Sequence, residues 1–214
     1  MKRALIVWGG LELHEPEAGA RLVAGWLEAE GFSVTVTGDY AALGASGIGD
    51  YDLVMPQITG GELEREPSIA LCAAIEAGTG LAAFHHGLAT SFPHNPRFRF
   101  LAACTFATHP GDIITYRVDP TGTSDPIMAG IGSFEHTSEQ YYMHVDPSVT
   151  DILATTTFSG EHAWWKTGVR MPTVFKTAYG KGRLFYSALG HKPAELEKPE
   201  IRTMLQRGML WAAR

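Results

Sequence analysis

The chain has 214 residues, of which 45% are hydrophobic and 19% are charged, and its formal net charge at pH 7 is −6. A chain of this length and apolar content can bury a sizeable core, which excludes an intrinsically disordered protein. The acidic balance argues against nucleic acid and against an anionic membrane as partners, because both attract basic patches. We therefore expect a globular, enzyme-like domain.

The sequence carries no sign of export. The apolar run at residues 4–8 is shorter than the core of a signal peptide, and no small-residue cleavage site follows it. No later segment has the apolar length that crossing a bilayer requires. Cys72 and Cys104 match no disulfide or metal-binding pattern, so we expect both to be small buried residues. These features predict a cytoplasmic protein.

The first half of the chain alternates predicted strands with predicted helices. Continuous apolar runs are typical of strands that are covered on both faces, and a proline is favourable in the first turn of a helix. Strands are predicted at residues 4–8, 34–36, 52–55 and 81–84, and helices are predicted to open at Pro16 and Pro67. This alternation implies parallel strands joined by right-handed crossovers. We predict an open, mainly parallel α/β sheet.

The second half is less regular. Strands are predicted at residues 113–118 and 152–157, and a helix is predicted from about Pro199 to the end. Residues 173–179 and 183–189 flank Gly180-Lys181-Gly182, which favours a short antiparallel hairpin. We find no internal repeat and no linker, so a single domain over residues 1–214 is expected.

Three predicted strands end in histidines. His14 lies in the loop after the first strand, His85 and His86 follow the fourth, and His191 follows the hairpin. Ligands of open α/β sheets bind outside the carboxyl ends of the strands, so we expect these imidazoles to meet at one edge. Any one of them alone would be a surface or core histidine, as we expect for His94 and His136. His109 and His162 are weaker candidates on loops.

A second cluster of functional groups lies in residues 138–145. Glu139 is followed there by Tyr141, Tyr142 and His144. A carboxylate beside imidazoles suits general acid–base catalysis or a divalent metal such as zinc. The alternative is an ordinary strand with alternating faces. We predict His85, Glu139 and His191 as catalytic residues, which would also supply the ligands of any metal, and as substrate-binding residues His14, His86, His109, Tyr141 and His144.

Several nucleotide and hydrolase motifs are absent from the sequence. Gly9-Gly10 lacks the spacing of a dinucleotide-binding loop, and there is no phosphate-binding P-loop. The chain also has no GxSxG motif, which leaves serine-hydrolase chemistry without support.

Four segments resemble the ThuA-like (trehalose utilisation) family of the class I glutamine-amidotransferase-like superfamily. They are Trp8-Gly9-Gly10 with His14-Glu15, residues 80–87, residues 139–145 and, most specifically, residues 172–177 leading to 179–191. The resemblance implies a flavodoxin-like three-layer sandwich. It also implies a role in the catabolism of trehalose and of keto derivatives of disaccharides. Amidotransferases carry their nucleophilic cysteine where this chain has His85, so amidotransferase chemistry is not expected.

The resemblance and the histidines together favour an enzyme that acts on a disaccharide oxidised to a ketone at C3. A ketone there acidifies the C2 hydrogen, so that a base can remove it and the C1 substituent can leave. In this fold a helix is expected to start directly after the fourth strand, and its positive end would keep His85 neutral.

Two alternatives stay open, a non-catalytic sugar-binding or regulatory module and a metal-dependent hydrolase of another small substrate. The expected partner is a small-molecule carbohydrate. A homo-oligomer is compatible with the sequence, but no motif specifies one.

Overall fold

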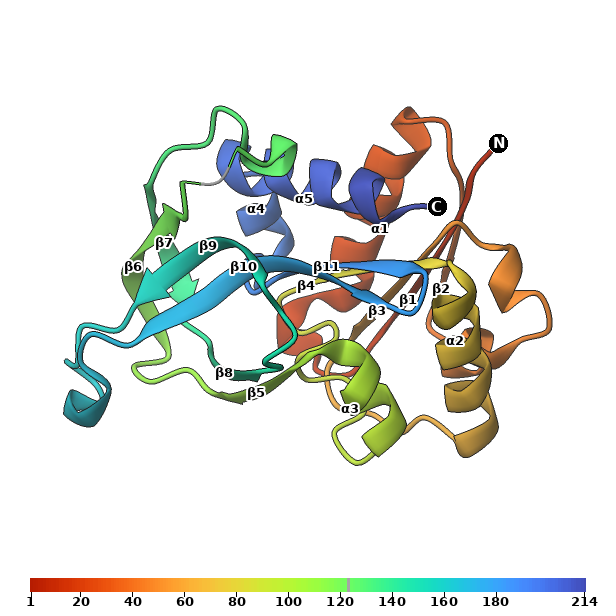
Figure 1. Ribbon diagram of the computed structural model, residues 1–214, viewed down its shortest axis with the longest axis horizontal. Coiled ribbons are helices and arrows are strands. Elements are labelled where there is room, and N and C mark those ends of the chain that lie inside the picture. Colours follow the sequence, from red (N-terminus) through yellow and green to blue (C-terminus); the bar gives the residue numbers. More distant parts are fainter. Residues whose placement is uncertain (123) are drawn as a thin grey trace.

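The computed structural model describes residues 1–122 and 124–214. Among these residues the strands form a nine-stranded sheet and a separate two-stranded sheet (Figure 1). In spatial order the large sheet contains β2 (Ser33–Thr37), β1 (Arg3–Gly9), β3 (Leu53–Ile58), β4 (Gly80–Phe84), β11 (Gly182–Ser187), β10 (Arg170–Tyr179), β9 (Asp151–Thr157), β6 (Ile113–Pro120) and β7 (Phe134–Glu139).

The large sheet has a parallel half and an antiparallel half. Strands β2, β1, β3 and β4 pair in parallel, as the first half of the sequence predicts, and β11 adds a fifth parallel strand beside β4. From β11 onward each neighbour is antiparallel, and the predicted hairpin is β10 with β11. Only β10 and β6 therefore run against the other strands of the described sheet. The carboxyl ends of β1, β4, β11 and β7 consequently lie along one edge.

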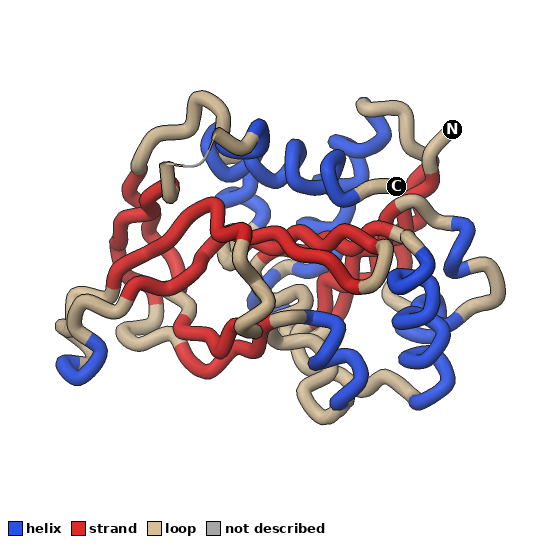
Figure 2. The backbone as a smooth tube through the Cα atoms, viewed as in Figure 1, coloured by secondary structure: helices blue, strands red, loops and turns tan. Residues whose placement is uncertain are grey.

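Helices cover both faces of the parallel half (Figure 2). Leu5 and Val7 of β1 pack in one core with residues of α2 (Arg65–Ala77) and α3 (Pro96–Ala102). Ala4 and Ile6 pack in a second core with α1 (Pro16–Ala29), α4 (Pro193–Leu196) and α5 (Pro199–Ala212). Burial on both faces explains why β1 is continuously apolar, and it gives the three-layer α/β sandwich that we expected.

Three local features differ from the sequence predictions. Helix α2 begins at Arg65, and Pro67 lies in its first turn, where a missing N–H costs no hydrogen bond. Strands β5 (Cys104–Thr108) and β8 (Tyr142–Val145) form the small antiparallel sheet, which we did not predict. Helices α3 and α4 were also missed.

In the described residues, none of the helices combines the length and the apolar character that a membrane crossing needs.

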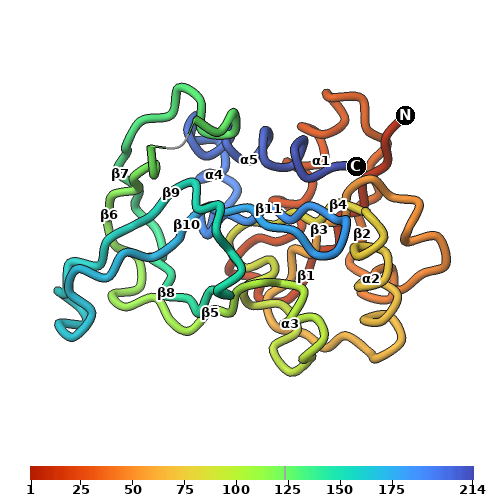
Figure 3. The backbone as a smooth tube through the Cα atoms, viewed as in Figure 1, coloured from red at the N-terminus to blue at the C-terminus, as the bar shows by residue number. Residues whose placement is uncertain are grey.

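Strand β11, the last strand in the sequence, lies inside the sheet rather than at its edge (Figure 3). Strand β11 lies between β4 and β10 and pairs with both along its length. Helix α5 then packs over it, with Gly208 so close to Phe185 that a Cβ at this glycine would clash with the ring. The absence of a side chain at Gly208 thus sets the distance between helix and sheet.

We expect Gly208→Ala to lower the free energy of unfolding by about 1–3 kcal/mol, because the added methyl group overpacks the contact with Phe185. Gly25 of α1 is the matched control, since no atom lies within 4 Å of a Cβ built there. Gly25→Ala should leave stability unchanged or raise it by up to about 1 kcal/mol. Urea unfolding of both variants measures the difference, and equal effects would contradict this account of the packing.

Candidate functional site

Histidines from three strand ends meet at the carboxyl edge of the sheet. His14 follows β1 and ends a short 3-10 helix (Glu12–His14), His85 follows β4, and His191 follows β11. The ring centroid of His14 lies 5.4 Å from that of His85 and 5.0 Å from that of His191, and the His85 and His191 centroids are 5.0 Å apart. The predicted convergence of these three imidazoles is confirmed.

Glu139, at the end of β7, brings a carboxylate into this group. Its Oε2 lies 3.2 Å from Nε2 of His85. Its Oε1 lies 3.7 Å from Nε2 of His191 and 3.7 Å from Nε2 of His109. The Nε2 atoms of His85 and His191 are buried, yet neither is aligned for a hydrogen bond within the described residues. One carboxylate therefore faces three imidazoles, and for His85 and His191 the nitrogen that faces it is buried without a hydrogen bond.

His85 is held in a strained backbone conformation. Its φ is 45°, which places a residue other than glycine in the left-handed region. Its N–H donates to the Ser187 carbonyl at 2.6 Å, and its own carbonyl accepts from the Tyr186 hydroxyl at 2.6 Å. Its Nδ1 lies 3.2 Å from the Tyr141 hydroxyl, which leaves Nε2 facing Glu139. Strand β11 thus fixes the main chain while Tyr141 orients the ring.

The expectation of a helix directly after the fourth strand is wrong. Residues 85–90 form a turn, and α3 begins only at Pro96. Burial, followed by the neighbouring histidines His14 and His191, holds the pKa of His85 well below its usual value. Burial and the charge of His191 likewise lower the pKa of His14 to about 4. Low dielectric and mutual repulsion, rather than a helix terminus, therefore keep these imidazoles neutral.

His14, His85 and Glu139 could hold a metal ion. Each offers one ligand atom, and these atoms all lie within 4.8 Å of one another. Two imidazoles and one carboxylate form a ligand set that zinc takes in catalytic sites. Nδ1 of His14 is 2.6 Å from the Thr59 hydroxyl, an outer contact that fixes the tautomer and orientation of a ligating histidine. The predicted metal set contained His191, whereas this group contains His14.

The other predicted binding residues divide into three kinds. His86 is buried against His14, with stacked rings 4.7 Å apart, and Tyr141 is buried against His85. His109 is half-buried on the loop after β5, with its Nδ1 3.5 Å from Asp112. His144 is exposed on β8, and its ring contacts Tyr142 rather than a cluster histidine. The structure therefore does not bring His144 to the cluster, because strand alternation turns Met143 inward instead.

Sequence reasoning missed Glu195 of α4. Its Oε2 lies 3.2 Å from Nε2 of His136, and it accepts hydrogen bonds from the Ser138 hydroxyl at 2.9 Å and from the His191 N–H at 3.0 Å. His136 and Ser138 belong to β7, so this carboxylate ties β7 to the loop that carries His191. The four-residue spacing of His191 and Glu195 was the only signal in the sequence.

We expect Glu195 to make the stability of the folded protein depend on pH. Burial alone would raise its pKa, but the contact with His136 and the hydrogen bond from Ser138 outweigh burial and hold the pKa below its usual value. A depressed carboxyl pKa adds stability above the unfolded pKa, and this stability is lost as pH falls through the folded value. We expect the melting temperature of Glu195→Gln to fall less than that of wild type between pH 5 and pH 3, whereas parallel curves would contradict the assignment.

The family model for ThuA, described as trehalose utilisation, matches residues 3–212. The chain belongs to the ThuA family. Its fold is also that of a ThuA-like protein from Parabacteroides merdae, with a TM-score of 0.81, 20% identity and coverage of 99% of this chain and 89% of the other. A ThuA-like protein from Bacteroides uniformis gives a TM-score of 0.76 at 19% identity, covering 98% and 89%. A cytoplasmic protein from Salmonella typhimurium LT2 gives 0.65 at 10% identity over both full lengths.

These likenesses confirm the predicted family and its flavodoxin-like α/β fold. No curated protein sequence matches this ThuA family chain. At 20% identity or less, the solved structures establish the fold alone.

Both cysteines of this ThuA family protein are buried. Burial raises the pKa of Cys72, and it raises the pKa of Cys104 to about 12. Because the thiolate is the reactive form, neither thiol is activated. We expect no reaction of the native protein with a thiol reagent and reaction of both residues after denaturation. Rapid labelling of either cysteine in the native state would contradict this.

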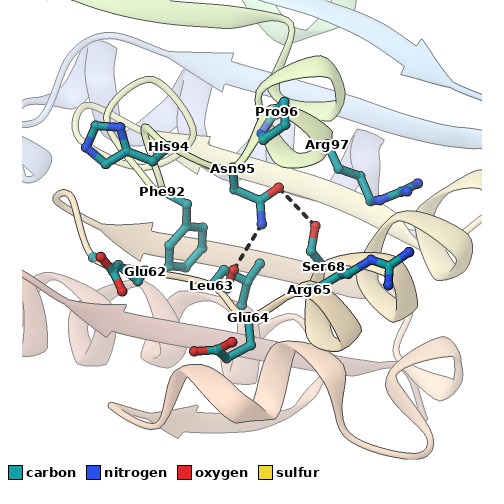
Figure 4. A pocket seen from close by; sticks show the side chains of 11 residues that line it. Glu62, Leu63, Glu64, Arg65, Ser68, Phe92, His94, Asn95, Pro96 and Arg97 are labelled. Atoms are coloured by element: carbon teal, nitrogen blue, oxygen red, sulfur yellow. Dashed lines mark hydrogen bonds between the residues drawn. The ribbon is translucent and has the colours of Figure 1, made fainter.

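A cavity of about 430 Å³ opens between the loops that follow β3 and β4 in this ThuA family protein (Figure 4). Glu62 and Glu64 lie on one side of it, and Arg65 and Arg97 lie on the other. Asn95 donates to the carbonyl of Leu63, another lining residue, at 3.0 Å. None of the predicted catalytic or substrate-binding residues lines this cavity. It is therefore distinct from the histidine cluster.

Proposed function

We propose that this protein is an enzyme of carbohydrate catabolism that acts on a disaccharide oxidised to a ketone at C3. The family match supports a role related to trehalose utilisation. The observation that carries the enzymatic proposal is the buried Glu139 carboxylate, which lies 3.2 Å from Nε2 of His85 and 3.7 Å from Nε2 of His191, together with the lowered pKa of His85. Binding alone needs no such group, whereas proton transfer does.

The proposed reaction begins with removal of the C2 proton by a base of the cluster. The C2–H electron pair forms an enolate with the C3 carbonyl. When the enolate collapses, the C1–O bond breaks, and the leaving alcohol takes a proton from a neighbouring acid. Glu139 and His85 lie 3.2 Å apart and share the roles of base and proton carrier, and His191 lies on the other carboxylate oxygen. No paired carboxylates of the ordinary glycosidase kind are required.

A metal-assisted form of the same function is favoured by one observation, the proximity of ligand atoms on His14, His85 and Glu139. A divalent cation such as zinc would supply a Lewis acid that polarises the ketone. In this form His191 is the base, because it lies beside Glu139 and outside the ligand group. Elemental analysis of the purified protein separates the two forms.

Proton exchange at C2 tests the proposal directly. Trehalose oxidised at C3 is incubated with the protein in D₂O, and the C2 proton signal is followed by NMR. We expect loss of that signal together with release of glucose. Binding of the sugar without exchange would favour the non-catalytic alternative, a sugar-binding or regulatory module. A cytoplasmic location and a small-molecule carbohydrate partner stay predictions.

A further inference from the structure

A second cavity, of about 460 Å³, lies in the antiparallel half of the sheet. Its volume is in the range of small-molecule sites. The lining comes from the start of β6, the residue after β7 and the end of β9 with its following loop: Ile114, Thr115, Tyr116, Arg117, Gln140, Thr157, Ser159, Glu161 and His162.

The cavity forms where β6 and β9 separate. Strand β6 pairs with β7 from Ile113 to Val118, but with β9 only from Val118 to Pro120. The first part of β6 therefore has no strand partner on its β9 side within the described residues. Gln140 crosses from the end of β7 and donates to the Thr156 hydroxyl at 2.7 Å. The opening thus lies at the same sheet edge as the cluster, because β6 runs opposite to β7 and β9.

The cavity and the histidine cluster share walls. Gln140 lines the cavity and directly follows Glu139 in the chain. Tyr116, another lining residue, donates its hydroxyl to the Glu139 carbonyl at 3.2 Å. On the other side, His162 packs so closely on Gly111 that a Cβ there would clash with the ring. Gly111 belongs to the loop of His109, whose Nε2 lies 3.7 Å from Glu139.

The lining suits an uncharged ligand that is rich in hydroxyl groups. Thr157 and Ser159 offer hydroxyls that donate and accept, and the Thr115 hydroxyl, which is paired with Thr137 at 2.8 Å, keeps a further lone pair. The amide N–H groups of Gln140 bond to Thr156 and Thr157, so Gln140 offers its carbonyl as an acceptor. The one arginine, Arg117, is already paired with Asp119 at 2.6 Å, and Glu161 offsets its charge, so an anionic ligand is not selected. Resting on the proposed function, we propose that this cavity binds the second, unreacted sugar unit of the disaccharide while the cluster acts on the oxidised unit.

The test compares two substrates and two positions. Trehalose oxidised at C3 carries the second sugar unit, and methyl α-glucoside oxidised at C3 lacks it. For wild type, the kcat/KM of C2 proton exchange should be at least about tenfold higher with the disaccharide than with the methyl glucoside. A tenfold difference corresponds to the free energy of one or two hydrogen bonds. Thr157→Trp fills the cavity and should remove this preference without slowing the methyl glucoside. Thr35→Trp, at an exposed threonine of β2, should retain it.

The outcomes separate this proposal from the proposed function. Exchange of both substrates with no preference in wild type, or an unchanged preference in Thr157→Trp, overturns the subsite alone. Exchange of neither substrate overturns the function, and binding of trehalose measured by calorimetry then decides the subsite. Weaker trehalose binding in Thr157→Trp but not in Thr35→Trp would support the subsite. No trehalose binding to wild type, or equal binding to wild type and Thr157→Trp, would overturn the subsite. Ser159→Trp, at an exposed loop residue, replaces Thr157→Trp if that variant unfolds.

Discussion

A His85→Gln variant is expected to lose C2 proton exchange by about two to four orders of magnitude, with far less change in sugar affinity. The Tyr141 hydroxyl lies 3.2 Å from Nδ1 of His85. A glutamine keeps a polar group beside this hydroxyl, but the glutamine amide cannot take a proton near neutral pH. The loss is expected whether His85 serves as base or as metal ligand, because both roles use the lone pair of Nε2, 3.2 Å from Glu139.

The control for this experiment is His94→Gln, at an exposed histidine outside the cluster. It should retain full exchange. Turnover and melting temperature are measured on the same samples, because His85 is fully buried and its replacement affects packing. A His85→Gln protein that melts lower but exchanges C2 at the wild-type rate would refute the catalytic assignment.

The second large effect concerns zinc. Metal-free protein is expected to bind one equivalent of Zn²⁺, and Glu139→Gln should weaken this binding by at least about a hundredfold, since losing a ligand costs more than losing its outer contact. Competition with a chromophoric chelator gives the affinity without any substrate. Zinc should also raise the melting temperature of wild type, because it binds the folded state.

Glu135→Gln is the matched control for the zinc experiment. Glu135 lies on the same strand as Glu139 and is exposed, so its replacement should leave the affinity unchanged. Equal affinities in the two variants, or no binding to wild type, would exclude the group of His14, His85 and Glu139 as a zinc site.

Sequence alone predicted the parallel half of the sheet well, for a physical reason. Strands such as β1 and β4 are buried on both faces, and a short continuous apolar run is typical of such a strand. The antiparallel half gave weaker signals. Strand β9 contains three successive threonines, and β7 alternates buried with exposed residues over a short stretch. Such patterns also occur in loops, so their pairing could not be derived locally.

The candidate site was predictable to the extent that it depends on strand ends. His14, His85 and His191 each follow a strand, and the rule for open α/β sheets places them together. Glu195 depends instead on tertiary contacts with His136 and Ser138. His144 lies outside the cluster because the register of β8 decides which of its side chains face inward, and only the structure supplies that register.

The central position of β11 has a consequence for biosynthesis. Strand β4 pairs with β11, which is made about a hundred residues later, so the β4 edge of the nascent chain stays unpaired while the whole segment between the two strands is synthesised. Long-range pairing of this kind slows folding and exposes intermediates to aggregation. His191 and the Ser187 carbonyl that holds His85 also arrive with β11 and the loop after it. The histidine cluster therefore cannot assemble during translation of the first half, and any ligand that needs it meets only a nearly finished chain.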